Sequence, residues 1–254
     1  MPSLYFTGDI HGDITRLSVE QFPEQQQMRD GQDNNFVCIT GDFGLVWNEE
    51  AESQSEKDKL DELENKPFTT LWVDGNHENF DRLYSNEYPI KEWSGGKAQF
   101  IRPHVIHLLR GEIYHVLGKK IFTFGGASSH DISDGILEPE DPRVYMWMKT
   151  NRDFRINHLE WWKEELASEK EMQNGREVLC KNNNKVDYII THCLPQEIAS
   201  SISAGVYKSD STTLYLQKVA QEVHFNQWYC GHYHIDKRIY CKYNILYHDI
   251  LRVL

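Results

Sequence analysis

Five short apolar runs in this chain each end in a compact polar motif, and this recurring arrangement constrains the fold more than any other feature. They are SLYFTGDIHGD (3–13), NFVCITGDFG (35–44), TTLWVDGNHEN (69–79), VDYIITHCLP (186–195) and FNQWYCGHYH (225–234). Their apolar parts have the length and the β-branched or aromatic content of buried strands. Because ligand groups collect at the carboxyl ends of strands in open α/β sheets, we expect the five motifs to converge.

The segments between these runs indicate how the sheets are covered. Apolar spacing and charge pairing predict helices at roughly 51–65, 157–173 and 212–224. Closely spaced strands between 98 and 126 resemble an antiparallel meander, and the C-terminal residues are predicted to form further strands. With 254 residues and no repeat or linker, the chain is expected to be a single domain, 1–254, of the α/β class, with two sheets covered by helices.

Charge and composition narrow the classes of partner. The formal net charge is −12, and residues 49–64 contribute half of it with eight acidic residues against two lysines. An acidic surface disfavours long nucleic acid. No run of 18 apolar residues predicts a membrane span, and the N-terminus lacks a signal-peptide pattern, so a cytoplasmic location is expected. The five cysteines form no CxxC pair, which argues against a disulfide framework and a thiolate zinc site.

Three of the motifs carry side chains that can bind metal or transfer protons. Asp9 and His11 are spaced at i and i+2, which suits half of a transition-metal site, although an Asp-capped turn is the alternative. Asp42 alone is typical of a strand-end turn. Asn76 offers a neutral carbonyl oxygen, and His77 can act as an acid near neutral pH, unless it is simply a polar loop residue.

The last two motifs add three histidines. His192 follows a strand, and His232 and His234 lie one residue apart, as two metal ligands or as two imidazoles on one face of a strand end. Strand alternation would point Tyr233 away from them. The complete candidate set suits two ions about 3.5–4 Å apart if one carboxylate bridges them, and it consists of Asp9, His11, Asp42, Asn76, His192, His232 and His234.

The ordered set GDIHG, GDFG, GNHE, THC and GHYH resembles the calcineurin-like metallophosphoesterase superfamily over residues 8 to 234. The resemblance implies a four-layer sandwich of two mixed β-sheets flanked by α-helices, with a dinuclear site at the strand ends. It implies that one ion binds Asp9, His11 and His234 and that the other binds Asn76, His192 and His232. Asp42 would bridge the two ions.

The same resemblance implies catalytic roles for two of these residues. Asp42 would help to hold a metal-bridging hydroxide that attacks phosphorus in line. His77 would protonate the leaving oxygen or stabilise the charge on it, with Glu78 or another carboxylate orienting the imidazole. The expected cofactors are two divalent transition-metal ions, with manganese the first choice and iron, zinc, cobalt or nickel also compatible.

One departure from the family pattern concerns the phosphate-binding arginine. Protein phosphatases of the superfamily continue as GDxVDRG, whereas this chain continues GDFGLVWNEE, which puts protein phosphatase activity in doubt. Arg82, Arg102 and Arg110 are possible substitutes. His130 and Asp131, in FGGASSHD (124–131), either approach the site or belong to a simple turn, and the turn is the favoured interpretation.

These observations lead to one main functional prediction and two alternatives. The main prediction is an enzyme, a metal-dependent phosphoric ester hydrolase that acts on a small phosphomonoester or nucleotide. The first alternative is a phosphodiesterase or nuclease for cyclic nucleotides or short nucleic acids. The second is a non-catalytic scaffold on the same fold. The sequence predicts a small phosphate ester as the partner and leaves the oligomeric state open.

Overall fold

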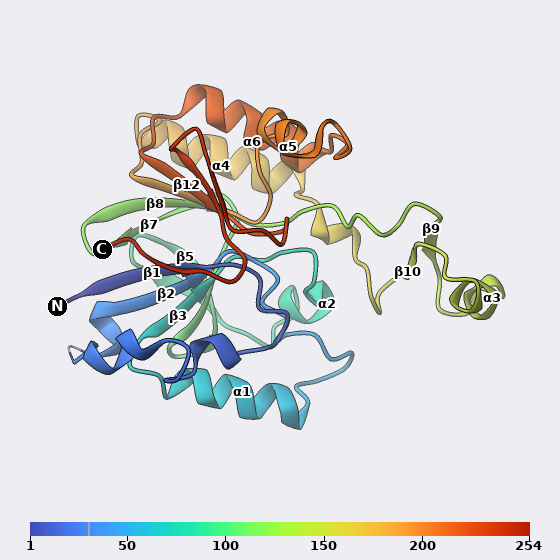
Figure 1. Ribbon diagram of the computed structural model, residues 1–254, viewed down its shortest axis with the longest axis horizontal. Helices are drawn as coiled ribbons and strands as arrows, with labels where there is room; N and C mark the ends of the chain where they lie inside the picture. Colours follow the sequence, from blue (N-terminus) through green and yellow to red (C-terminus); the bar gives the residue numbers. More distant parts are fainter. Residues whose placement is uncertain (30) are drawn as a thin grey trace.

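The computed structural model describes residues 1–29 and 31–254 and contains two mixed β-sheets that pack face to face. The layer between the sheets is apolar: Phe6 and Leu71 of one sheet and Ile121 and Ile190 of the other belong to the same buried cluster. The helices cover the two outer faces (Figure 1). The predicted four-layer α/β sandwich is therefore confirmed.

The first sheet has seven strands in the order β15-β1-β2-β3-β6-β5-β4. Strands β1, β2, β3 and β6 run parallel, and β15, β5 and β4 pair antiparallel with their neighbours. The strands are β1 (Ser3–Thr7), β2 (Asn35–Ile39), β3 (Thr69–Trp72), β4 (Ile90–Trp93), β5 (Gly96–Arg102), β6 (Val105–Leu108) and β15 (Ile250–Arg252).

The second sheet has six strands in the order β13-β14-β12-β11-β8-β7, and β8, β11, β12 and β14 run parallel. They are β7 (Glu112–Val116), β8 (Lys119–Phe124), β11 (Tyr188–Thr191), β12 (Gln227–Cys230), β13 (Lys237–Ile239) and β14 (Tyr243–Ile245). The strands predicted as one meander between 98 and 126 are thus divided: β5 and β6 pair in the first sheet, and β7 and β8 pair in the second.

Helices pack on each sheet through apolar faces. On the first sheet, α1 (Gln54–Glu64) buries Leu60 and Leu63, and a capping box of Ser53 and Glu56 fixes its start. The second sheet is covered by α4 (Glu169–Lys181), α5 (Gln196–Ser203) and α6 (Ser211–Glu222). The short helix α2 (Phe80–Leu83) follows the GNHE motif, and 3-10 turns lie at Thr15–Leu17, Pro23–Gln27, Gln32–Asn34 and Lys163–Glu165.

The helix predicted at 157–173 is wrong over residues 157–168. The structure begins α4 at Glu169, where Ser168 and Glu171 form a capping box. The preceding residues form a loop because Trp162 is buried and its indole Nε1 donates to Asp81 Oδ2 over 2.7 Å. A continuous helix would not allow the loop to make this long-range contact, and the Ser-x-x-Glu signature marks the true start.

Residues 130–158 form an arm that the sequence did not predict. It contains the parallel pair β9 (Gly135–Leu137) and β10 (Phe154–Ile156) with α3 (Arg143–Lys149) between them. Figure 1 shows the arm projecting from the body on the side opposite the two termini. No helix in the described part of the chain is long and apolar enough to cross a membrane. The single-domain assignment and the cytoplasmic location stay predictions.

Candidate metal centre

The five motifs follow five strands that end at the same edge of the sandwich. Strands β1, β2 and β3 are parallel neighbours in one sheet, and β11 and β12 are parallel neighbours in the other. His192 joins the two sheets, because its Nδ1 lies 2.8 Å from the carbonyl oxygen of Thr40. Gly231 N in turn donates to the carbonyl oxygen of His192 over 3.1 Å.

The first group of side chains, here the exposed cluster, consists of Asp9, His11 and His234 beside Asp42. The ligand atoms of these four residues all lie within 4.8 Å of one another. His234 Nε2 is 3.3 Å from Asp9 Oδ2 and 3.1 Å from His11 Nε2. Two imidazole nitrogens at this separation carry lone pairs that repel unless a proton or a cation lies between them, so the geometry fits a bound cation.

The second group, here the buried cluster, consists of Asn76, His192 and His232 on the other side of Asp42. His192 Nε2 lies 3.2 Å from Asp42 Oδ1 and 3.3 Å from Asn76 Oδ1. The His232 ring is 4.9 Å from the His192 ring, and its backbone N donates to both Asp9 oxygens, at 3.1 and 3.0 Å. His232 thus joins this cluster through a ring contact, whereas the group of ligand atoms that all lie within 4.8 Å of one another includes neither His192 nor His232.

Asp42 presents one carboxylate oxygen to each cluster. Its Oδ2 is 3.8 Å from His11 Nε2, whereas its Oδ1 faces His192 Nε2 and accepts hydrogen bonds from the backbone N of Asn76 and His77, both at 2.9 Å. Burial would raise the pKa of this carboxyl, but His192, His77 and His11 outweigh that effect and lower it. An ionised carboxylate with its two oxygens directed at different donor groups is suited to bridging two cations.

Four of the candidate ligands have left-handed backbone. His11, Asp42, His232 and His234 have φ values of 45°, 47°, 70° and 49°. Such a conformation costs about 1–2 kcal/mol per non-glycine residue. Strain that clusters at several candidate ligands is typical of a functional site, because the surrounding structure has to compensate for it.

The backbone of the last motif differs from the strand expected at the sequence level. β12 ends at Cys230, and His232 and His234 lie in the loop that follows it. Tyr233 nevertheless points away from the cluster: it packs against the core of the second sheet, and its hydroxyl accepts a hydrogen bond from Leu194 N over 3.0 Å. Local left-handed geometry, and not strand alternation, produces this orientation.

Two glycines make room for the carboxylates of other motifs. A Cβ at Gly75 would lie 2.0 Å from Asp42 Oδ1, and a Cβ at Gly231 would lie 1.9 Å from Asp9 Oδ1. A side chain at either position would displace the neighbouring carboxylate. There is therefore a steric reason for glycine at position 75, before Asn76, and at position 231, before His232.

His77 lies at the edge of the exposed cluster. Its ring is 5.0 Å from the ring of His11 and 5.9 Å from that of Trp47, and it is partly accessible. Glu78 is buried and accepts hydrogen bonds from Phe43 N and Gly44 N at 2.7 and 3.2 Å. Burial raises the pKa of the Glu78 carboxyl. Glu78 therefore fastens the GDFG loop and, in the described contacts, does not orient His77.

The charge balance at the centre also fits a metal. Within the described part of the chain, the ion-pair partners of Asp9 and Asp42 are all imidazoles, with no lysine or arginine. Burial alone would lower the pKa of His192, but Asp42 and Asp9 raise it to about 10. Its Nδ1 faces a carbonyl acceptor, which leaves Nε2 directed at Asp42 and Asn76 for a cation.

None of the three arginines considered from the sequence reaches this centre with a free guanidinium. Arg82 is buried against Glu56 and Glu87. Arg102 pairs with the carboxylates of residues 52 and 61. Arg110 is buried against Asp74.

The loop between β8 and the arm supplies side chains that sequence reasoning missed or set aside. Ser129 Oγ lies 3.5 Å from Asn76 Nδ2 and donates to Glu165 Oε2 over 2.6 Å. The ring of His130 is 4.4 Å from that of His232, so His130 approaches the centre and the simple-turn interpretation is wrong for it. Ser129 and Glu165 carried no signal because they are 36 residues apart and meet only in the fold.

A cleft of about 530 Å³ opens directly beside the buried cluster. The residues that line it include Ser129, His130, Tyr207, Asp210 and His232. The His130 ring lies 4.6 Å from the Tyr207 ring. The volume is within the range of small-molecule sites, which is about 300–1,000 Å³.

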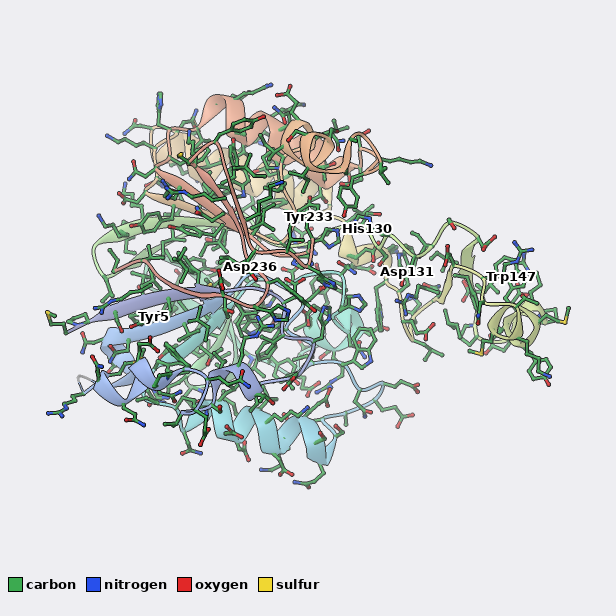
Figure 2. The ribbon with its side chains drawn as sticks, in the orientation of Figure 1. Tyr5, His130, Asp131, Trp147, Tyr233 and Asp236 are labelled. Carbon is green, nitrogen blue, oxygen red and sulfur yellow. The ribbon has the colours of Figure 1, made fainter. Side chains whose placement is uncertain are left out.

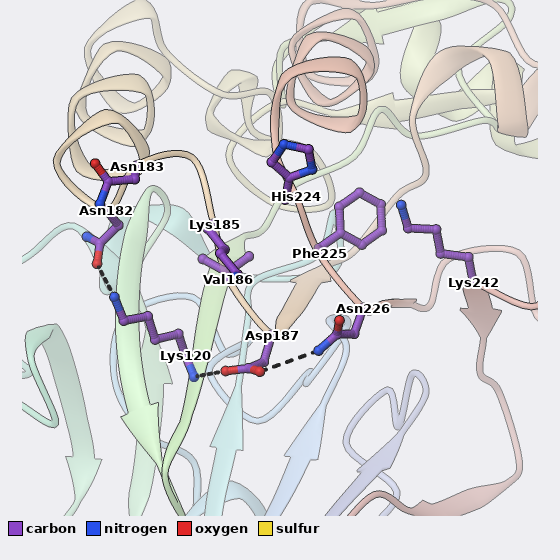
Figure 3. Close-up of a pocket in the computed structure, with 10 residues that line it drawn as sticks. All are labelled: Lys120, Asn182, Asn183, Lys185, Val186, Asp187, His224, Phe225, Asn226 and Lys242. Carbon is purple, nitrogen blue, oxygen red and sulfur yellow. Dashed lines mark hydrogen bonds between the residues drawn. The ribbon is translucent and has the colours of Figure 1, made fainter.

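A second pocket, also about 530 Å³, lies at the amino ends of the second sheet's strands, away from the motifs (Figure 3). Two of its three lysines have partners of their own: Lys120 Nζ donates to Asn182 Oδ1 over 3.0 Å, and Lys242 Nζ lies 3.6 Å from the Phe225 ring centroid. None of the seven predicted ligands lines this pocket. The candidate metal ligands therefore lie at the opposite ends of the strands, where the five motifs meet, and not in this pocket.

A two-sheet α/β sandwich that gathers imidazole, carboxylate and amide donors at its strand ends defines the class of metal-dependent hydrolases. The family model for calcineurin-like phosphoesterase matches residues 2–236. The chain belongs to this family and is therefore a metal-dependent phosphoric ester hydrolase. Comparison with curated proteins gave no match.

Proposed function

We propose that this protein is a dinuclear phosphoesterase that hydrolyses a small phosphomonoester or nucleotide. The exposed cluster would hold one divalent ion and the buried cluster the other, with Asp42 shared between them. The observation that carries this proposal is the placement of the two Asp42 oxygens, 3.8 Å from His11 and 3.2 Å from His192. Manganese is the first choice of metal. Iron, zinc, cobalt and nickel are also compatible, because nitrogen and oxygen ligands accept several divalent ions.

The chain's own residues supply positioning and proton transfer. Two ions in such a site generate a nucleophile from water at neutral pH and neutralise charge on phosphoryl oxygens. Asn76 and His192, both buried, would hold the ion of the buried cluster. His77, accessible at the edge of the exposed cluster, would donate a proton to the leaving oxygen.

The cleft supports the choice of a small substrate. Its volume of about 530 Å³ accommodates the leaving group of a nucleotide or a compact phosphomonoester. The formal net charge of −12 disfavours a long polyanion, because the surface outside the centre would repel it. A small phosphate ester is therefore the proposed substrate.

The proposal is tested with manganese-loaded protein and p-nitrophenyl phosphate. Asp42→Asn keeps an oxygen for the two backbone donors but removes the bridging charge, so we expect kcat to fall about a thousandfold or more. Asp58→Asn, an exposed change on α1, serves as the control and should be neutral. Full activity in Asp42→Asn would contradict the assignment. Comparison with bis-p-nitrophenyl phosphate tests monoester preference.

A further inference from the structure

Arginine can bind a phosphoryl group through two parallel hydrogen bonds, and the chain lacks the arginine of the GDxVDRG pattern of related phosphatases. Arg82 and Arg110 are buried in ion pairs with about 4% and 2% of their side chains exposed. Arg16 donates to Thr7 Oγ1 and to the carbonyl oxygens of Gly8 and Tyr247. The hydrogen-bond donors of these three guanidinium groups are therefore engaged by protein acceptors and are not directed at a substrate.

Arg155, on β10 of the arm, is placed differently. Its Nη2 donates to Asp131 Oδ2, and about 26% of its side chain is exposed, against 49% for Asp131. A guanidinium has five N–H donors in a planar fork. The ion pair with Asp131 occupies one edge of this fork and is the only hydrogen bond of the Arg155 side chain among the described contacts.

The base of the arm connects this arginine to the metal centre through neighbouring residues. Three consecutive residues each make one connection: Ser129 contacts Asn76, His130 packs on His232, and Asp131 binds Arg155. Figure 2 shows His130 and Asp131 where the arm leaves the body. The Asp131 carboxylate is therefore one residue away from a side chain that touches a candidate ligand.

Electrostatics agree with this placement. Burial would raise the pKa of the Asp131 carboxyl, but Arg155 and, more weakly, His77 lower it. The Arg155 guanidinium also acts on the carboxylate of Glu165, which holds Ser129. Arg155 therefore carries a positive charge beside Asp131 and within electrostatic reach of the Glu165 carboxylate.

We propose that Arg155, held in position by Asp131, binds the phosphoryl group of the substrate. This proposal rests on the proposed phosphoesterase function. The planar fork of arginine matches two phosphoryl oxygens at once, which a lysine ammonium does not. The arm thus supplies from residue 155 the cation that related phosphatases take from the segment after their second motif.

The test measures binding of inorganic phosphate to the metal-loaded protein by isothermal titration calorimetry, together with steady-state kinetics. Arg155→Ala should weaken phosphate binding and raise KM by about tenfold or more, with unchanged metal content. Arg155→Lys should recover part of the loss, because it keeps the charge. Arg152→Ala is the matched control: Arg152 also lies in the arm, pairs with Asp134 and is exposed, so its loss should change neither quantity.

Asp131→Asn separates substrate binding from a merely structural ion pair. Because Asp131 holds the guanidinium in position, Asp131→Asn should weaken phosphate binding, but by less than Arg155→Ala, since the cation itself remains. Equal damage from Asp131→Asn and Arg155→Ala, or wild-type phosphate affinity in Arg155→Ala, would overturn the proposal. Failure of the proposed function looks different, since wild-type protein with two ions would then neither hydrolyse phosphate esters nor bind phosphate.

Discussion

The two clusters of the candidate centre use similar ligands but differ in their surroundings. In the exposed cluster, 34% of the His11 side chain and 50% of the His234 side chain are accessible. In the buried cluster, the His192 side chain is fully buried and Asn76 is only 6% accessible. The contrast concerns these four side chains, because Asp9 of the exposed cluster is buried and His232 of the buried cluster is partly accessible.

The difference follows from where each side chain originates. His192 follows a central strand of the second sheet and reaches Thr40 of the first, so both sheets hold it. His11 and His234 lie in left-handed loop positions, and His234 is supported by a stacked ring, that of Tyr247, at 4.6 Å. We expect the buried cluster to be rigid and the exposed cluster to exchange its ion more readily.

The largest effect expected from this contrast comes from removing one histidine in each cluster. His192→Ala leaves Asp42 without its buried partner and opens space between the sheets, so the free energy of unfolding should fall by about 3–5 kcal/mol. His234→Ala should change it by less than about 0.5 kcal/mol, because the side chain is half exposed. Thermal or urea unfolding of the metal-free proteins measures both values.

Metal analysis completes this comparison. Each variant should lose about one ion per chain relative to wild type, but only His192→Ala should also lose stability. Equal stability losses in the two variants would show that the contrast in burial has no energetic consequence. Loss of both ions from His234→Ala would show that the clusters bind metal as one unit.

The strand runs and the ligand motifs could be predicted from the sequence because each is local. A buried strand followed by Gly-Asp or Gly-His carries its own signal, and parallel order then brings the ends together. The missed features depend on distant contacts. Arg155 meets Asp131 across 24 residues, and Trp162 leaves the expected helix to reach Asp81 across 81 residues. The apolar periodicity of the sequence identifies neither contact, because it reports only on local secondary structure.

A second prediction concerns the pH dependence of stability and involves Glu165, which binds Ser129 next to the buried cluster. Burial raises the pKa of Glu165 to about 7, although hydrogen bonds from Ser129 oppose the shift. The carboxyl ionises near pH 4.5 in the unfolded chain but near 7 in the folded protein. Its contribution to stability is therefore complete below pH 4.5 and is lost as the pH rises through 7, by about 2–3 kcal/mol.

Glu165→Gln should remove this dependence, because a neutral amide can accept from Ser129 N and donate to Ser129 Oγ. Urea unfolding of the metal-free protein between pH 5 and 8 compares the two slopes. Glu164→Gln, a neighbouring change in a partly exposed residue, is the control and should keep the wild-type slope. An unchanged slope in Glu165→Gln would assign the pH dependence to other groups.

The smallest expected effect lies in the exposed cluster and concerns the aromatic ring that supports His234. The Tyr247 ring stacks on His234 with an interplanar angle of 19°. A contact between aromatic rings contributes about 0.5–1.5 kcal/mol, and partial exposure places this one at the lower end. Tyr247→Leu should therefore weaken the more weakly held ion about threefold in a competition with a chelator, and leave the other ion unchanged. A loss of tenfold or more would mean that the stacked ring fixes His234 firmly, so that the exposed cluster is as preorganised as the buried one.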